Sequence, residues 1–231
     1  MNNSINIYQN YIPRSHAAVN VVIDVIRAFS TASFAFKQGF SSIILLDSVA
    51  HGLSLFDHFP NIILAGENSA DPISEFHIDN SPFMLCSLND HGSKLGLLTT
   101  NGVRVLKDSY NADLVLAVSA NNAIETALLL HKIMLQTSMP INLIASHPTA
   151  IEDLACAHFI KNIIVSGVYP SPGDISTFTY QIINSDAGLD FISPNIPNRD
   201  IVDLVYCSQV VDHPPIQCSF SDSSIFLSIY V

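Results

Sequence analysis

The sequence has few charged residues, very few basic ones, and no hydrophobic run long enough for a membrane-spanning helix. Only 13% of its 231 residues are charged, and 9 Lys and Arg stand against 20 Asp and Glu, for a formal net charge of −11. Because the basic residues form no cluster, binding to nucleic acid or to an anionic membrane surface is not expected. No apolar stretch approaches the roughly 18 residues that a spanning helix requires.

Cysteine is also scarce. The four cysteines, Cys86, Cys156, Cys207 and Cys218, show no CxxC pairing. This pattern is typical of buried thiols in a reducing compartment rather than of zinc ligands or a disulfide framework. The initial segment MNNSINIYQN also lacks the basic and apolar regions of a signal peptide. We therefore expect a cytoplasmic location.

Short apolar runs alternate with helix-like segments along most of the chain. The runs predict strands at 5–8, 19–24, 42–46, 62–65, 95–99, 113–118 and 141–145, and helices at 28–38, 48–58, from about 102, 121–135 and 149–164. Such alternation predicts an α/β fold with a mostly parallel sheet sandwiched between helices. After a polar loop at 66–82 and a weaker pattern beyond 168, we expect a strand-rich C-terminal tail. Residues 1–168 should form the core that carries the site, with 169–231 packed on it as one compact unit.

Polar residues follow five of the predicted strands. The groups are Asp24, then Gly66 and Glu67, then Thr99–Gly102, then Ser119 and Asn122, and finally Glu152 and Asp153 in the first turn of a helix. The carboxyl ends of parallel strands share one edge of a sheet, so these groups are predicted to converge on one crevice.

The residue types in these groups indicate metal-assisted phosphoryl chemistry. Asp24, Glu67, Glu152 and Asp153 supply hard oxygen ligands that suit Mg²⁺ better than zinc. The turn at 99–102 offers hydroxyls and free N–H groups to a phosphate at a helix start. Arg27 could hold an anionic group in a bidentate fork.

Each of these features also has a purely structural explanation. Asp24 and the 99–101 turn could be ordinary helix caps. Glu152 and Asp153 would also favour the positive end of their helix dipole. Arg27 could pair with a carboxylate of the protein and contact no ligand. It is the convergence of all these groups that favours a functional site.

The chain resembles the Mg²⁺-dependent 2-phosphosulfolactate phosphatases of coenzyme M biosynthesis and their bacterial relatives. The resemblance covers nearly the whole chain and rests on these segments in order: VVIDVIRAFST (21–31), AGE (65–67), DNSP (79–82), LLTTNGVR (97–104), SANNA (119–123), IEDLACA (151–157) and RDIVDLVYCSQVVDHPPI (199–216). It implies a phosphoric monoester hydrolase that uses Mg²⁺ and acts on a small acidic metabolite, a 2-phospho-hydroxyacid such as 2-phosphosulfolactate.

The resemblance also implies which residues form the site. Catalytic positions fall on Asp24, Arg27, Glu67 and Asn101, and metal-binding positions on Asp24, Glu67, Glu152 and Asp153. Substrate-binding positions fall on Ser30, Thr31, Asn80, Ser81, Thr99, Thr100, Gly102 and Asn122. The expected partner is a small phosphorylated substrate, with neither nucleic acid nor a membrane, and a homo-oligomer is left open.

Several positions depart from the family pattern and leave a second function open. Residues 68–71 replace an arginine and a glycine-rich stretch, and Glu75, Asp79 and Val103 stand where the family has other residues. New carboxylates near an anion site repel an anionic substrate. The alternative is therefore a catalytically silent relative that binds an anionic metabolite or a partner. A haloacid dehalogenase-type phosphatase is disfavoured, because Ile26 occupies the place of that family's second acid.

Overall fold

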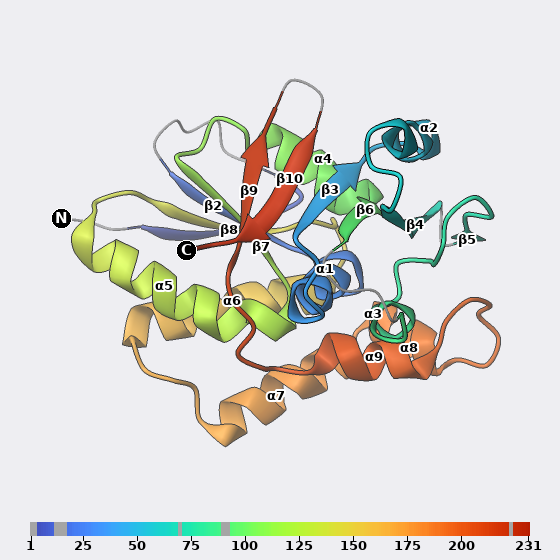
Figure 1. Ribbon diagram of the computed structural model, residues 1–231. Coiled ribbons are helices and arrows are strands. Elements are labelled where there is room, and N and C mark those ends of the chain that lie inside the picture. Colours follow the sequence, from blue (N-terminus) through green and yellow to red (C-terminus); the bar gives the residue numbers. More distant parts are fainter. Residues whose placement is uncertain (1–3, 12–17, 69–70, 89–92, 222–223) are drawn as a thin grey trace.

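The computed structural model describes residues 4–11, 18–68, 71–88, 93–221 and 224–231 (Figure 1). Within them ten strands join in one sheet, in the order β1-β8-β2-β7-β9-β10-β3-β6-β4-β5. The strands are β1 Ile5–Gln9, β2 Val19–Ile23, β3 Ser42–Leu46, β4 Ile63–Asn68, β5 Asp71–Pro72, β6 Lys94–Leu98, β7 Leu114–Val118, β8 Ile141–Ala145, β9 Ile216–Phe220 and β10 Ile225–Ile229.

The α-helices in the described residues are α1 Ala28–Lys37, α2 Val49–Ser54, α3 Pro82–Cys86, α4 Thr100–Asp108, α5 Ala123–Gln136, α6 Ile151–Ser166, α7 Pro172–Ile183, α8 Asp186–Ile192 and α9 Ile201–Ser208. Short 3₁₀ turns at Leu55–Asp57 and Ala120–Asn122 adjoin α2 and α5. The predicted α/β class and most predicted elements are confirmed. None of the described helices is long and apolar enough to cross a membrane.

The sheet contains two parallel groups of strands joined by an antiparallel hairpin. The strands β1, β8, β2 and β7 are parallel to one another, as are β3, β6 and β4. Between them β9 and β10 pair antiparallel with each other and with β7 and β3. Along the hydrogen-bonded order the two groups therefore run in opposite senses. The strand direction turns markedly across the sheet (Figure 1), as the twist of sheets and especially of two-stranded ribbons requires.

Both faces of the central strands are buried, which explains their mostly apolar sequences, interrupted in β2 and β8 by Asn20 and Asn142. In β2, Val21 and Ile23 pack with α5 and α6 on one face, whereas Val22 packs with α1 and the second parallel group on the other. A smaller cluster under α2 covers β3, β4 and β6. Parallel strands covered by helices on both faces read as apolar runs without alternation.

The C-terminal part differs in detail from the pattern that the sequence suggested. Residues 172–208 form three helices before the two C-terminal strands appear. Their starts are marked by capping side chains at Ser171, Ser185 and Asp200, each accepting a backbone N–H. The predicted loop at 66–82 also contains structure, because β4 continues to Asn68 and β5 pairs with it.

Candidate active site

Asp24 lies directly after β2, at the point where the chain turns into α1. Its backbone N–H donates to the carbonyl of Val118 at 3.0 Å, which extends the β2–β7 ladder by one residue. The peptide bond between Ile26 and Arg27 is cis, and α1 begins at Ala28. Asp24 is only 7% exposed, so its carboxylate lies in the interior at the carboxyl end of the strand.

A cavity of about 320 Å³ brings together residues from four separate segments. Asp24 lines it from the end of β2, Asn101 from the start of α4, and Glu152 and Asp153 from the start of α6. Asp153 is fixed at both oxygens: Oδ1 accepts the N–H of Val25 at 2.8 Å, and Oδ2 accepts the hydroxyl of Ser146 at 3.3 Å. Asp186 and Asp190 of α8 complete the acidic lining.

The three buried carboxylates of this cavity repel one another. Burial and the charge of Glu152 raise the pKa of Asp24 to about 7, although the N–H of Ala28 opposes the rise. Burial also raises the pKa of Glu152, and burial with the charges of Asp24 and Glu152 raises that of Asp153. No Lys or Arg is among the described residues that line the cavity.

A divalent cation fits this donor set chemically. Hard carboxylate oxygens, an amide and hydroxyls are the groups that Mg²⁺ accepts in proteins, usually while it keeps several waters. In the described part of the chain no three acidic, His or Cys side chains already converge on one coordination point. A bound Mg²⁺ would therefore be held through side-chain adjustment or through its retained waters.

Arg27 lies in a neighbouring cluster of charges and not in the acidic cavity. Its guanidinium pairs with Glu67, with Asp79 at 3.1 Å and with Asp203 at 2.8 Å, and it lies over the ring of Phe191. Burial alone would lower the pKa of Arg27, but the three carboxylates outweigh it and raise the pKa. Among the described residues Arg27 thus pairs with carboxylates of the protein, which is the structural explanation that its sequence position left open.

Glu67 belongs to the Arg27 cluster as well. It pairs with Arg27 and, at 3.3 Å, with Arg199, and it is not among the residues lining the Asp24 cavity. Its charge still contributes to the raised pKa of Asp24, so the two carboxylates are near neighbours. In this conformation Glu67 therefore pairs with the two arginines and does not lie beside Asp24 as a metal ligand.

The turn at the start of α4 lies where the sequence predicted an oxyanion cradle. Thr99 is the N-cap residue, and its side chain makes no capping hydrogen bond. Gly102 packs closely on its neighbours: an added Cβ would lie 3.0 Å from the ring of Phe29, which would have to shift, and 3.5 Å from Oδ2 of Asp24. The side chain of Thr100 lies outside the described residues.

Four other predicted substrate-binding side chains make internal hydrogen bonds. Ser30 and Thr31 donate to the backbone carbonyls of Val25 and Asn80 at 2.7 Å. The remaining contacts are Asn122 Nδ2 to the Ala117 carbonyl at 3.1 Å and Ser81 Oγ to Asp203 Oδ1 at 2.6 Å, while Asn80 Oδ1 is buried without a partner among the described residues. These side chains hold the β2–α1 and 79–82 segments in place.

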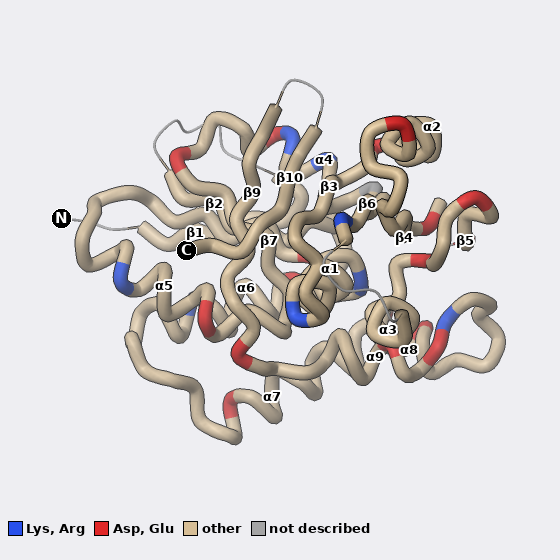
Figure 2. The backbone as a smooth tube through the Cα atoms, viewed as in Figure 1, with Lys and Arg blue, Asp and Glu red and all other residues tan. Residues whose placement is uncertain are grey.

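Sequence reasoning missed several residues at the site. Asp186 and Asp190 line the acidic cavity, although the segment SDAGLD has the sequence signature of an ordinary capped helix start. Asp203 is 1% exposed and joins Arg27 to Ser81, but its depth cannot be inferred from sequence. Acidic and basic positions lie close together around α8 and α9 in the charge map (Figure 2).

Comparison of the sequence with known proteins shows which family the chain belongs to. The sequence model of the family described as 2-phosphosulpholactate phosphatase matches residues 7–192. The chain belongs to this family. The match includes every residue of the acidic cavity and ends at α8, so α9 with Asp203 and the β9–β10 hairpin lie beyond it.

Relatives in this family match most of the chain. A probable 2-phosphosulfolactate phosphatase of Bacillus subtilis is 34% identical over 206 residues, which cover 89% of each chain. Another from Symbiobacterium thermophilum is 31% identical and covers 83% of this chain and 87% of its own. One from Clostridium tetani is 28% identical and covers 81% and 83%. The protein is therefore a phosphatase, a phosphoric monoester hydrolase of the 2-phosphosulfolactate phosphatase family.

Proposed function

We propose that the protein hydrolyses a small acidic phosphorylated metabolite, a 2-phospho-hydroxyacid resembling 2-phosphosulfolactate, in a Mg²⁺-dependent reaction. The observation that carries this proposal is the group of three buried carboxylates in one cavity beside the start of α4. Buried carboxylates without a cation are costly to a folded protein, and a divalent ion offsets that cost. The free cysteines and the absence of basic clusters support a cytoplasmic enzyme that acts on small molecules.

Within this proposal, Asp24 and Asp153 would hold Mg²⁺, with Glu152 close by. The ion would supply positive charge to the phosphoryl oxygens as negative charge develops on them. Asp153 is the best oriented of the three, because its two oxygens are already held by Val25 and Ser146.

The first turn of α4 would hold the phosphoryl group opposite these carboxylates. Its backbone N–H groups have no partner within the helix, and the helix dipole adds positive potential at this end. Asn101 lines the acidic cavity and can donate its amide to a phosphoryl oxygen.

Arg27 and Glu67 act on this site through positioning rather than through the contacts predicted from sequence. Arg27 links the β2–α1 segment to Glu67 at the end of β4 and to Asp203 of α9. Loss of that link would release the segment that carries Asp24.

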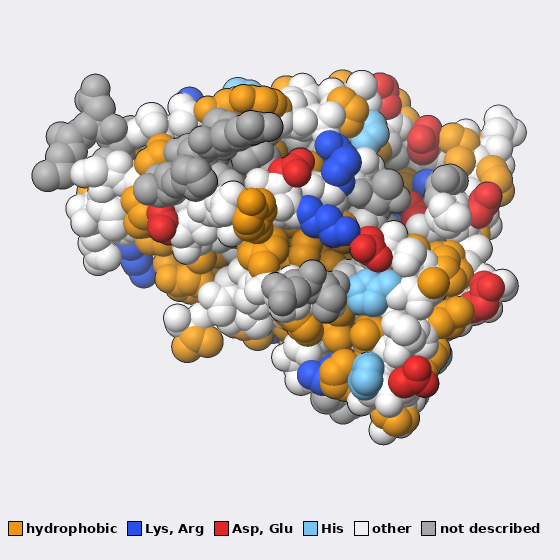
Figure 3. Space-filling view, turned by 90° about the horizontal axis from the view of Figure 1, so that it is seen from above, with side chains coloured by type: hydrophobic (Ala, Val, Ile, Leu, Met, Phe, Trp, Pro, Cys, Tyr) orange, Lys and Arg blue, Asp and Glu red, His pale blue; other side chains and the backbone are white. Residues whose placement is uncertain are grey.

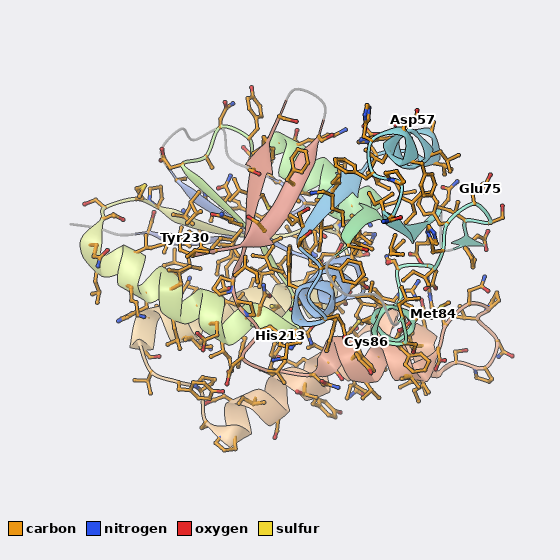
Figure 4. The ribbon with its side chains drawn as sticks, viewed as in Figure 1. Asp57, Glu75, Met84, Cys86, His213 and Tyr230 are labelled. Atoms are coloured by element: carbon orange, nitrogen blue, oxygen red, sulfur yellow. The ribbon has the colours of Figure 1, made fainter. Side chains whose placement is uncertain are left out.

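The test is phosphate release from 2-phospho-hydroxyacids with Mg²⁺ and with EDTA. We expect release only with Mg²⁺, and a loss of about 100-fold or more for Asp24→Asn. The control is Asp57→Asn, which removes the same charge from an exposed position near α2 (Figure 4). Release that persists in EDTA would contradict Mg²⁺ dependence.

The silent relative is distinguished in the same samples. That alternative expects Mg²⁺ and a phosphorylated ligand to raise the thermal midpoint without any phosphate release. It is excluded if Asp24→Asn abolishes a turnover measured in the unmodified protein.

A further inference from the structure

A second cavity, of about 530 Å³, is lined by other residues of the α4 segment than the acidic one. It is lined by residues from the carboxyl ends of β4 and β6 and from α4, including Thr99, Arg104 and Lys107. Figure 3, which shows the molecule from above, has Lys and Arg side chains near the middle of that face, beside acidic and His side chains. This neighbouring cavity therefore carries two basic side chains beside the carboxylates of Asp47 and Glu67, whereas no Lys or Arg is among the described residues that line the Asp24 cavity.

Among the basic residues near the site, Arg104 differs from the others in its partners. Arg27 and Arg199 pair with carboxylates, and Lys107 pairs with Asp47 at 3.0 Å. Within the described residues Arg104 forms no ion pair; its guanidinium donates to the side-chain oxygen of Asn10 and, at 3.4 Å, to the carbonyl of Ser146. Its positive charge is therefore not neutralised by a carboxylate.

Arg104 also connects the two cavities. Ser146, whose carbonyl it contacts, lines the acidic cavity, while Arg104 itself lines the second one. Asn101 and Arg104 are three residues apart on α4, so they share a helix face with Cβ atoms about 5–6 Å apart. A three-carbon substrate with its phosphoryl group at Asn101 would bring a neighbouring acid group within reach of the Arg104 side chain.

We propose that Arg104 binds the acid group of the substrate, its carboxylate or sulfonate, and so selects phosphomonoesters that carry one beside the phosphoryl group. This inference rests on the proposed function. It assigns to Arg104 the anion-binding role expected of Arg27, whose guanidinium already pairs with Glu67, Asp79 and Asp203. A planar guanidinium binds carboxylate-like groups through two parallel hydrogen bonds, which an ammonium cannot do.

The test uses two substrates of nearly the same shape, 2-phospholactate and isopropyl phosphate, which differ only in a carboxylate that replaces a methyl group. The measured quantity is the ratio of their kcat/KM values. We expect the unmodified protein to favour 2-phospholactate, and Arg104→Gln to lower the ratio by about 10- to 100-fold through loss of a charge-assisted hydrogen bond. Arg104→Lys should restore only part of it. If Arg104 had only a structural role, Arg104→Gln would lower kcat/KM for both substrates alike and leave their ratio unchanged.

The matched control is Lys107→Gln, which removes one positive charge from the same cavity. If it lowers the ratio as much as Arg104→Gln does, or if Arg104→Gln lowers the ratio by less than about tenfold, the assignment to Arg104 is overturned. If the unmodified protein releases phosphate from neither substrate, the proposed function fails instead. In that case, calorimetric titration with the two compounds tests the role of Arg104. The unmodified protein should bind 2-phospholactate more tightly than isopropyl phosphate, and Arg104→Gln should lose this preference.

Discussion

Three asparagines form a hydrogen-bonded row across β1, β8 and β2 in the interior. Asn6 donates to Asn142 at 3.1 Å, and Asn142 donates to Asn20 at 2.9 Å, in register across the three parallel strands. Asn20 and Asn142 are nearly fully buried. Such polar side chains are tolerated in a sheet only because each amide finds a partner in the next strand.

We expect Asn142→Val to lower the free energy of unfolding by about 1–3 kcal/mol, because it leaves the buried amide of Asn20 without its donor. The measurement is urea denaturation. Asn6→Val, at the half-exposed end of the row, should cost less, since water can replace the lost partner. Equal losses for the two variants would show that the row does not act as described.

His213 is a second buried polar residue with a measurable consequence. It lies beside α1 (Figure 4), with Nδ1 2.9 Å from the hydroxyl of Ser33 and its ring edge-on to Phe34. Burial and the charge of Lys37 lower the pKa of His213, and Asp212 only partly opposes this.

A lowered pKa means that the unfolded chain binds a proton more readily than the folded one. The contribution of His213 to the free energy of unfolding should therefore rise with pH up to about 6.5 and fall as the pH drops below that value, whereas the buried carboxylates with raised pKa values contribute in the opposite sense. We expect His213→Gln to remove this contribution, so that the difference in free energy of unfolding between the unmodified protein and the variant grows as the pH rises from about 5 to 6.5. The exposed His58→Gln serves as the control. A profile that stays the same in His213→Gln would contradict the assignment.

The end of α6 depends on a glycine. Gly167 has φ +66°, and its N–H donates to the carbonyl of Ile163 at 2.8 Å. An added Cβ would lie 2.4 Å from Nε2 of His131, which packs from α5. A left-handed conformation and a close neighbour both require glycine here.

Gly167→Ala is accordingly expected to lower the free energy of unfolding by at least about 1 kcal/mol. The paired control is Gly173→Ala in the first turn of α7. There an added Cβ would meet only Ser171 Oγ, at an ordinary 3.7 Å, so the change should be neutral or slightly stabilising. Thermal unfolding of the two variants compares these outcomes. A Gly167→Ala protein as stable as the control would contradict the account of this helix end.

Most elements were predictable because the local pattern determines them. Strands such as β2 and β8 are buried on both faces, so each appears as a short apolar run ended by a polar residue. The reversal between the two parallel groups was not predictable, since it is imposed by β9 and β10, which pair with strands far away in sequence. The short helices α7–α9 were missed because their caps resemble loop sequence.

The same distinction applies to the candidate site. Asp24, Asn101, Glu152 and Asp153 were predicted together from their places after strands, and the structure brings them to one cavity. The pairing of Arg27 with three carboxylates could not be predicted. It depends on Asp79 and Asp203, which lie 52 and 176 residues from Arg27 in sequence and meet it only in the folded chain.

The protein as a whole carries a large excess of negative charge, and three buried carboxylates concentrate part of it in the Asp24 cavity. The metal-free fold must hold these like charges together, so the proposed Mg²⁺ should stabilise the whole molecule. At a concentration 100 times its dissociation constant, a ligand adds about 2.7 kcal/mol to the free energy of unfolding. For a chain of this size that is a rise of roughly 5–10 °C in the thermal midpoint.

We therefore expect MgCl₂ to raise the thermal midpoint of the unmodified protein more than NaCl of equal ionic strength does. Asp24→Asn should have a higher midpoint than the unmodified protein in EDTA, because it removes one of the repelling charges, and it should lose most of the rise with Mg²⁺. Asp57→Asn removes the same charge from an exposed position and should keep the full rise. A rise that Asp24→Asn retains in full would place the ion elsewhere, whereas the absence of any rise in the unmodified protein would contradict the metal site itself.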